Sequence, residues 1–183
     1  QSLHGLGFRL ESLSYLAAAL LPFLGVFAIE AWRLGKARTS LIVSFCVGFS
    51  LCMVAMPDLS IPQVIDFTHE NDRFQGIVAT LTKAITDHPT GQQVVLSILC
   101  GFGLSGLSGL WNCRKETIST VESLVHDVCY WSLTLGWLLY ALTRGFVFDR
   151  FILIWAFLLP IVWIRILPTK LLIAQYILLT VIA

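Results

Sequence analysis

Charged residues are scarce in this sequence, and their scarcity argues against a soluble domain. Asp, Glu, Lys and Arg make up 13% of the chain, whereas hydrophobic residues make up 57%. A typical soluble domain has about 25% charged and about 45–50% apolar residues. The mean hydropathy of +0.82 points the same way. The composition therefore predicts a protein of the lipid bilayer.

An excess of positive charge is also missing. The 12 basic residues nearly balance the 11 acidic ones, which gives a formal net charge of +1. Proteins that bind nucleic acid need a basic field to neutralise phosphates. We therefore expect no nucleic-acid partner.

Motifs of catalysis and cofactor binding are absent too. The five cysteines form no C-x-x-C pair, which is the spacing of zinc and redox sites, and no P-loop, dinucleotide fingerprint or H-E-x-x-H occurs. G-x-S-G, the pattern in which intramembrane serine proteases place their nucleophile, occurs twice between Gly103 and Gly109. Such a protease also needs a histidine base within hydrogen-bond reach of the serine. The one histidine near a span is His126, and it is predicted toward the cytoplasmic end. We expect no cofactor or metal, and rank an enzyme third among the functions considered.

Long apolar runs are what the sequence does contain. About 20 apolar residues in a helix cross the hydrocarbon core of a bilayer. Five runs qualify as spans, at residues 13–32, 41–56, 94–111, 121–142 and 151–167. Residues 171–183 are too few to cross, so they form either a truncated sixth helix or an interfacial one. The predicted fold is all-α: one polytopic membrane helix bundle over residues 1–183, with a kink at Pro22.

One long polar segment, residues 57–93, interrupts these spans. Its apolar residues recur at intervals of three and four between Phe74 and Ile85, which predicts an amphipathic helix. Such a helix lies on the membrane surface or caps the bundle.

The same segment carries a small acidic group. Asp66, His69 and Glu70 would share one face of a helix, and Asp72 follows them. Histidine and carboxylate side chains are ligands of zinc and other transition metals. The group could instead form a contact surface for a partner. The ordinary interpretation is that it is the solvated start of a helix.

The distribution of basic residues predicts the topology. Arg33, Lys36 and Arg38 follow the first span, and short basic connectors face the cytoplasm. Residues 57–93 hold few basic residues and fit the opposite side. The chain is therefore expected to be a multi-pass membrane protein with a non-cytoplasmic N-terminus.

Small residues recur at every fourth position in two of the spans. Such spacing places them on one helix face, where they allow a second helix to approach closely in lipid. The residues that we expect at helix contacts are Ser44, Gly48 and Cys52 in the second span, and Ser97, Gly101, Ser105 and Gly109 in the third. The alternative is that the hydroxyl groups line a pore.

Charged residues near the span ends form a second candidate group. Glu30, His126, Asp127 and Arg165 are all predicted within about two turns of the cytoplasmic boundary. Arg165 could pair with Glu30 or Asp127, either as a structural tie or as a gate or ligand site. No charged residue falls at a span centre, where ion-coupled transporters usually place one.

Two functions follow from these patterns. The first is a non-catalytic subunit or regulator of a larger membrane assembly, whose partners are the bilayer and other membrane subunits or a second copy. The second is a small-solute channel or transporter, with serines and threonines such as Thr134 lining a polar path.

Overall fold

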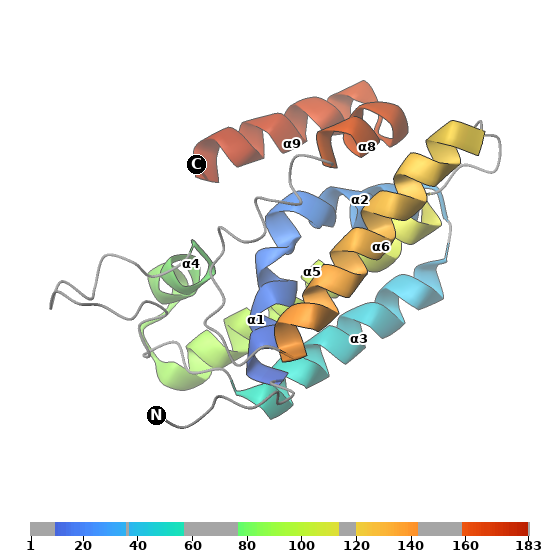
Figure 1. Cartoon of the computed structure of the whole chain (residues 1–183). Coiled ribbons are helices and arrows are strands. Elements are labelled where there is room, and N and C mark those ends of the chain that lie inside the picture. The colour runs from blue at the N-terminus through green and yellow to red at the C-terminus, as the bar shows by residue number, and fades with distance from the viewer. Residues whose placement is uncertain (1–9, 36, 57–76, 114–119, 143–158, 183) are drawn as a thin grey trace, which may run out of the picture.

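The computed structural model describes residues 10–35, 37–56, 77–113, 120–142 and 159–182. Of these described residues, 91% are helical and none belongs to a strand, so the predicted all-α class is confirmed. The helices, coloured along the chain in Figure 1, are α1 (Leu10–Ala19), α2 (Leu21–Arg33), α3 (Arg38–Ala55), α4 (Ile77–Ile85), α5 (Pro89–Asn112), α6 (Thr120–Leu142), α8 (Leu159–Ile166) and α9 (Thr169–Ile182).

Two of the described helices, α3 and α5, are long and apolar enough to cross a membrane. The pair α1 and α2 is a third candidate if the two count as one broken span. These helices support a membrane protein with two or three spans, and the count of five stays a prediction. The predicted fourth range, 121–142, is helical as α6. The fifth, 151–167, is described only from residue 159 onwards, where it contains α8.

The predicted first span is broken rather than continuous. The axes of α1 and α2 differ by 70°, and Pro22 lies in the first turn of α2. Proline has no N–H, so it cannot continue the hydrogen-bond ladder of the preceding helix. The ladder starts again where the backbone N–H groups of Phe23 and Leu24 both donate to the carbonyl of Leu20, at 3.1 and 2.9 Å.

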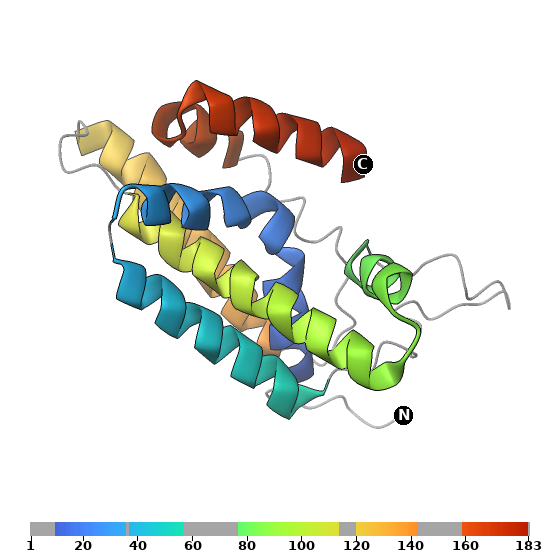
Figure 2. The ribbon, with the colours of Figure 1, turned by 180° about the vertical axis from the view of Figure 1, so that it is seen from behind.

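Helix α5 lies at the centre of the described bundle. Figure 2 shows it between α2 and α3, with α9 on the far side of α2. Glycines make this position possible, because a Cβ on Gly48 of α3 would lie only 2.7 Å from the carbonyl oxygen of Cys100. On its other side, a Cβ on Gly106 would lie 2.7 Å from the backbone of Leu24. Backbones at this separation gain dispersion energy along the whole contact.

Two outer helices, α6 and α9, are joined to α1 and α2 by side chains that donate to backbone carbonyls. On α6, the indole N–H of Trp137 donates to the carbonyl of Leu13 at 2.8 Å. On α9, the amide of Gln175 donates to the carbonyl of Pro22, beside the break. Both bonds join residues more than 100 positions apart in the chain.

Candidate functional site

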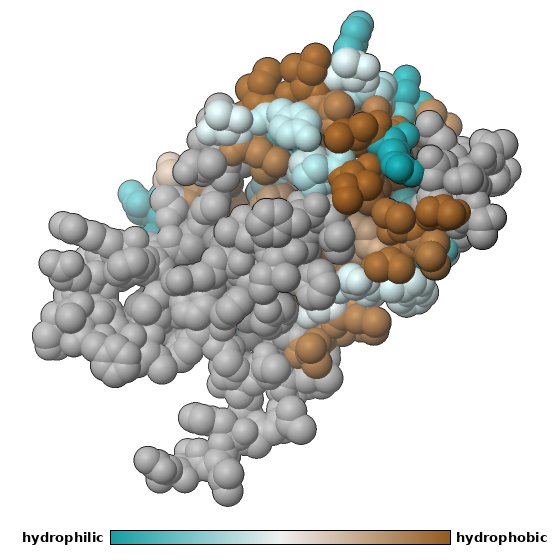
Figure 3. Space-filling view, turned by 45° about the horizontal axis from the view of Figure 1, so that its top comes forward, coloured by the Kyte–Doolittle hydropathy of each residue, from teal (hydrophilic) through white to brown (hydrophobic). Residues whose placement is uncertain are grey.

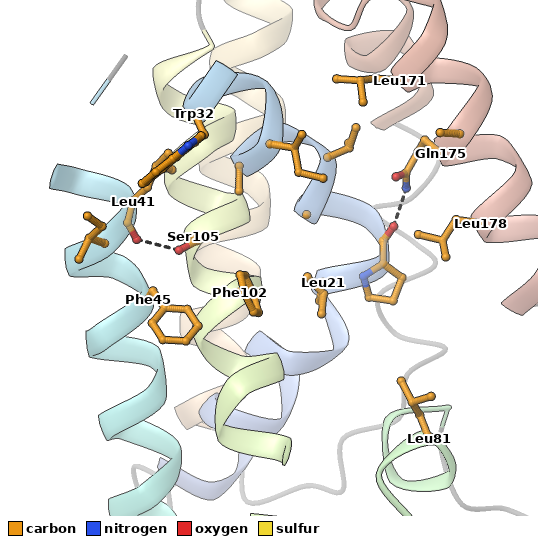
Figure 4. A pocket seen from close by; sticks show the side chains of 17 residues that line it. Leu21, Trp32, Leu41, Phe45, Leu81, Phe102, Ser105, Leu171, Gln175 and Leu178 are labelled. Carbon is orange, nitrogen blue, oxygen red and sulfur yellow. Dashed lines mark hydrogen bonds between the residues drawn. The ribbon is translucent and has the colours of Figure 1, made fainter. Parts of the chain in front are cut away.

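An apolar groove runs along the described bundle between α3 on one side and α9 on the other (Figure 4). Its floor comes from α2 and α5, and its volume is about 780 Å³. Leucine, isoleucine, valine and aromatic side chains supply most of the wall, with small residues at Gly25, Ala28 and Ala174. The polar side chains in the wall are Ser105 and Gln175. We call this feature the α3–α9 groove.

Both polar side chains of the groove are already engaged with backbone. The hydroxyl of Ser105 donates to the carbonyl of Leu41 across the α3–α5 contact, at 2.7 Å. Gln175 donates to Pro22, as described above. Figure 4 draws both bonds as dashed lines. With one donor of each side chain used in this way, the groove offers mainly apolar surface.

The structure places most of the predicted helix-contact residues between α3 and α5. Gly48 lies against the backbone of α5, since a Cβ on Gly48 would lie 2.9 Å from the Cα of Gly101, and Gly101 in turn lies against Phe45 of α3. Cys52 and Ser97 are buried, and the hydroxyl of Ser97 donates within α5 to the carbonyl of Gln93 at 2.7 Å. Ser44 is half-buried on α3. A polar contact outside the predicted set, from Gln93 to the carbonyl of Cys52 at 2.7 Å, joins the same two helices.

Gly109 lies on a different face of α5 from the others. A Cβ there would lie 2.6 Å from the backbone of Phe27 and of Ala28, both on α2. Gly103 and Gly106 share this second face, against α1 and α2. Neither was among the residues predicted at helix contacts. The signal that could have found them is their spacing of three, because residues 103, 106 and 109 also fall on one helical stripe.

The predicted charged group contains one strong ion pair, which lies within α2. Glu30 is 3% exposed, and both of its carboxylate oxygens accept from the guanidinium of Arg33, at 2.7 and 2.8 Å. Glu30 therefore has a partner within α2, and the suggested pairing of Arg165 with Glu30 or Asp127 stays a prediction. Arg165 lies exposed on α8.

His126 is a buried polar residue that joins two helices. Its Nε2 lies 2.9 Å from the carbonyl oxygen of Leu110 on α5, so the N–H at that nitrogen donates across the contact. Its Nδ1 lies 3.6 Å from a carboxylate oxygen of Asp127. The geometry of His126 is that of a tie between α5 and α6.

The predicted metal or partner loop, with Asp66, His69, Glu70 and Asp72, lies outside the described residues. Within the part of the chain that the structure describes, no three His, Cys, Asp or Glu side chains gather where they could hold a metal ion.

Helix α6 carries an apolar stripe that points away from the bundle. Its members alternate at intervals of three and four, and each is exposed: Val121, Leu124, Val128, Trp131, Leu135 and Leu138. We call this stripe the α6 seam. The opposite face of α6 carries His126, Cys129 and Leu133, which are buried.

Aromatic rings extend the α6 seam onto α5. The ring of Trp111 lies with its centroid 4.8 Å from that of Tyr130 and 6.3 Å from that of Trp131. Trp111 and Trp131 are both exposed. Apolar side chains also appear on the face that Figure 3 shows, with polar ones scattered among them.

No protein-family model, curated protein or solved structure matches the chain. A functional assignment therefore rests on the residues and contacts of the chain itself.

Proposed function

We propose that the protein is a non-catalytic integral membrane subunit or regulator of a larger membrane assembly, and that α6 contacts its partner. The observation that carries this proposal is the α6 seam. Apolar residues spaced alternately by three and four form a seam that packs into the grooves of a second helix. Tryptophan and tyrosine are also the residues that most often dominate binding energy at protein interfaces.

The use of polar side chains inside the bundle also favours a structural role. A solute path needs hydroxyl groups that face an open passage. Instead, Ser105 donates to the carbonyl of Leu41, Ser97 to that of Gln93, and Thr134 to that of Tyr130 at 2.9 Å. These hydroxyls hold backbones together or bond within their own helix.

The proposal keeps the topology predicted from the sequence. The chain would cross the membrane five times, with α6 as the fourth span and residues 151–167 as the fifth. Its N-terminus would be non-cytoplasmic, because basic residues (Arg33, Lys36 and Arg38) gather where α2 ends and α3 begins, and such residues favour the cytoplasmic side. The α6 seam would then face the interior of the bilayer, where a partner's membrane helix could reach it.

The test is photocrosslinking in the native membrane with the full chain. A photoreactive side chain at Val128 lies within the α6 seam, and one at Val47 of α3 serves as a matched control. The two positions are 52% and 54% exposed, so lipid reaches both equally well. We expect a discrete protein adduct from Val128 and mainly lipid adducts from Val47.

The outcome that would overturn the proposal is equally defined. Lipid adducts alone from both positions, together with a native mass no greater than that of the 20.4 kDa chain in its detergent, would exclude a subunit. An adduct of two identical chains would identify the partner as a second copy.

A transporter is the second candidate, and the break between α1 and α2 is the observation that favours it. Broken membrane helices build the substrate sites of many secondary transporters. Solute flux into proteoliposomes that contain this protein alone would support that function. Sealed proteoliposomes without flux are expected if the protein is a subunit.

A further inference from the structure

We propose that the α3–α9 groove binds one anionic phospholipid, with an acyl chain in the groove and the phosphate group at Arg38. This inference goes beyond the proposed function and does not depend on it, because the groove and the α6 seam are built from different residues. It rests on the lining of the groove, on its size and on the charge at one end.

The lining suits a hydrocarbon chain. Side chains from four packed helices and Leu81 of α4 form the wall. Because Ser105 and Gln175 are the polar side chains of the wall and each already donates to a backbone carbonyl, a polar ligand would lose its bonds to water and find few to replace them. An acyl chain has no such bonds to lose.

The size of the groove argues against a whole helix as its occupant. A helix with its side chains is about 10–12 Å wide, which is bulky beside a groove of about 780 Å³. A single extended acyl chain is much thinner than a helix, and a groove of this volume can hold it.

One end of the groove carries positive charge. The guanidinium of Arg38 lies 5.4 Å from the centroid of the Trp32 ring, and Trp32 lines the groove. Nearby Arg33 is neutralised by Glu30, whereas Arg38 has no carboxylate partner among the residues that the structure describes. Lys170 directly precedes Leu171, which lines the opposite wall.

This arrangement matches the two ends of an anionic lipid. Tryptophan prefers the level of the headgroups, and a guanidinium binds phosphate through paired N–H donors. The charge at the end of the groove would favour a lipid with net negative charge over a zwitterionic one with the same chains.

The test counts bound lipids by native mass spectrometry. The full chain in detergent is titrated with phosphatidylglycerol or with phosphatidylcholine of identical acyl chains. We expect the first phosphatidylglycerol to bind at least about fivefold more tightly, the contribution of one basic residue at a membrane surface. Arg38→Gln should remove that preference, and Arg38→Lys should keep most of it.

A second pair of variants tests the position of the chain. Ala174→Phe projects a ring into the groove from α9, and Ile177→Phe on the exposed face of the same helix is its control. Ala174→Phe should abolish the first binding event for both lipids, whereas Ile177→Phe should leave it unchanged. Gly25→Leu should block the groove from α2, because Gly25 lines it and a Cβ there meets only the side chain of Leu21.

Two results would overturn the inference. One is equal affinity of the unaltered chain for the two lipids together with no effect of Arg38→Gln, which indicates ordinary surrounding lipid. The other is unchanged binding in a folded Ala174→Phe or Gly25→Leu variant. The lipid-binding measurements use the isolated protein. Their outcome is therefore independent of the crosslinking result that tests the proposed function.

Discussion

Gly103 of α5 lies directly against the carbonyl oxygen of Ala17 near the end of α1, with no room for a Cβ between the two backbones. Ala17 lies just before the break, where the helical ladder is interrupted. A Cα–H group that faces a carbonyl in this way adds a weak hydrogen bond to close helix packing. The broken pair α1 and α2 therefore depends on the absence of a side chain at position 103.

We predict that Gly103→Ala lowers the free energy of unfolding by about 1–3 kcal/mol, the usual cost of overpacking a filled interior. The added methyl group must push α1 away from α5, because its nearest neighbours are backbone atoms. Reversible unfolding in mixed detergent micelles, followed by circular dichroism, measures the change.

Gly25→Ala is the control for this prediction. A Cβ at Gly25 would meet Leu21 Cδ1 at 2.9 Å, and that atom is the end of a flexible side chain. Replacing a helical glycine by alanine also reduces the entropy of the unfolded chain. Gly25→Ala should leave stability unchanged or raise it, and an equal loss at both positions would contradict the packing argument.

A second prediction concerns the coupling of Gly48 and Gly101. A Cβ on Gly101 would lie 2.9 Å from the carbonyl oxygen of Phe45, so each glycine of the pair keeps the same two helices together. Once Gly48→Ala has separated α3 from α5, Gly101→Ala has less contact left to lose. The double variant should therefore lose less stability than the sum of the two single variants, by about 0.5–3 kcal/mol.

Gly109 provides the comparison for that cycle. It contacts α2 rather than α3, so Gly48→Ala and Gly109→Ala should be additive to within about 0.5 kcal/mol. Equal coupling in both pairs would mean that α2, α3 and α5 move as one unit and that the two faces of α5 are not independent.

Much of the fold could be predicted from local patterns in the sequence. Runs of apolar residues located α3, α5 and α6 to within a few residues, because length and hydropathy are properties of a single segment. The proline in the first apolar run predicted a kink, and the structure has a 70° break there. The sequence did not reveal that Gly103 accommodates this break, because that contact joins segments more than 80 residues apart.

The candidate sites were harder to predict for the same reason. One wall of the α3–α9 groove is α9, which Gln175 joins to Pro22 of α2, and no spacing within α2 or α9 indicates that pairing. Glu30 and Arg33 are three residues apart on one helix, which is a local pattern. Only more distant pairings, of Arg165 with Glu30 or Asp127, were considered from the sequence, and the pair with Arg33 was missed.

A third prediction separates a hydrogen bond between helices from one within a helix. Ser105→Ala removes a bond from α5 to α3, whereas Ser97→Ala removes a bond from α5 to itself. Hydrogen bonds between membrane helices contribute about 0.6 kcal/mol on average, so Ser105→Ala should lose about that much. Ser97→Ala should lose less, because its partner carbonyl belongs to the same helix. A larger loss at Ser97 would contradict the assignment.

The last prediction concerns the Glu30–Arg33 pair, whose members are unequally exposed. The side chain of Glu30 is 4% exposed and that of Arg33 is 60% exposed. Arg33→Gln would leave a carboxylate buried without its partner, whereas Glu30→Gln would leave a guanidinium that solvent and lipid headgroups can reach. Removing one member of a pair is most costly when the charge left behind is buried.

We therefore expect Arg33→Gln to destabilise the protein more than Glu30→Gln does, and the double variant to be more stable than Arg33→Gln alone. Unfolding midpoints of the three variants in one detergent measure this order. The double variant decides the question, because it lacks Arg33, as Arg33→Gln does, but no longer has the buried charge of Glu30. If it were no more stable than Arg33→Gln, the role of Arg33 would be the packing of its aliphatic stem rather than neutralisation of Glu30.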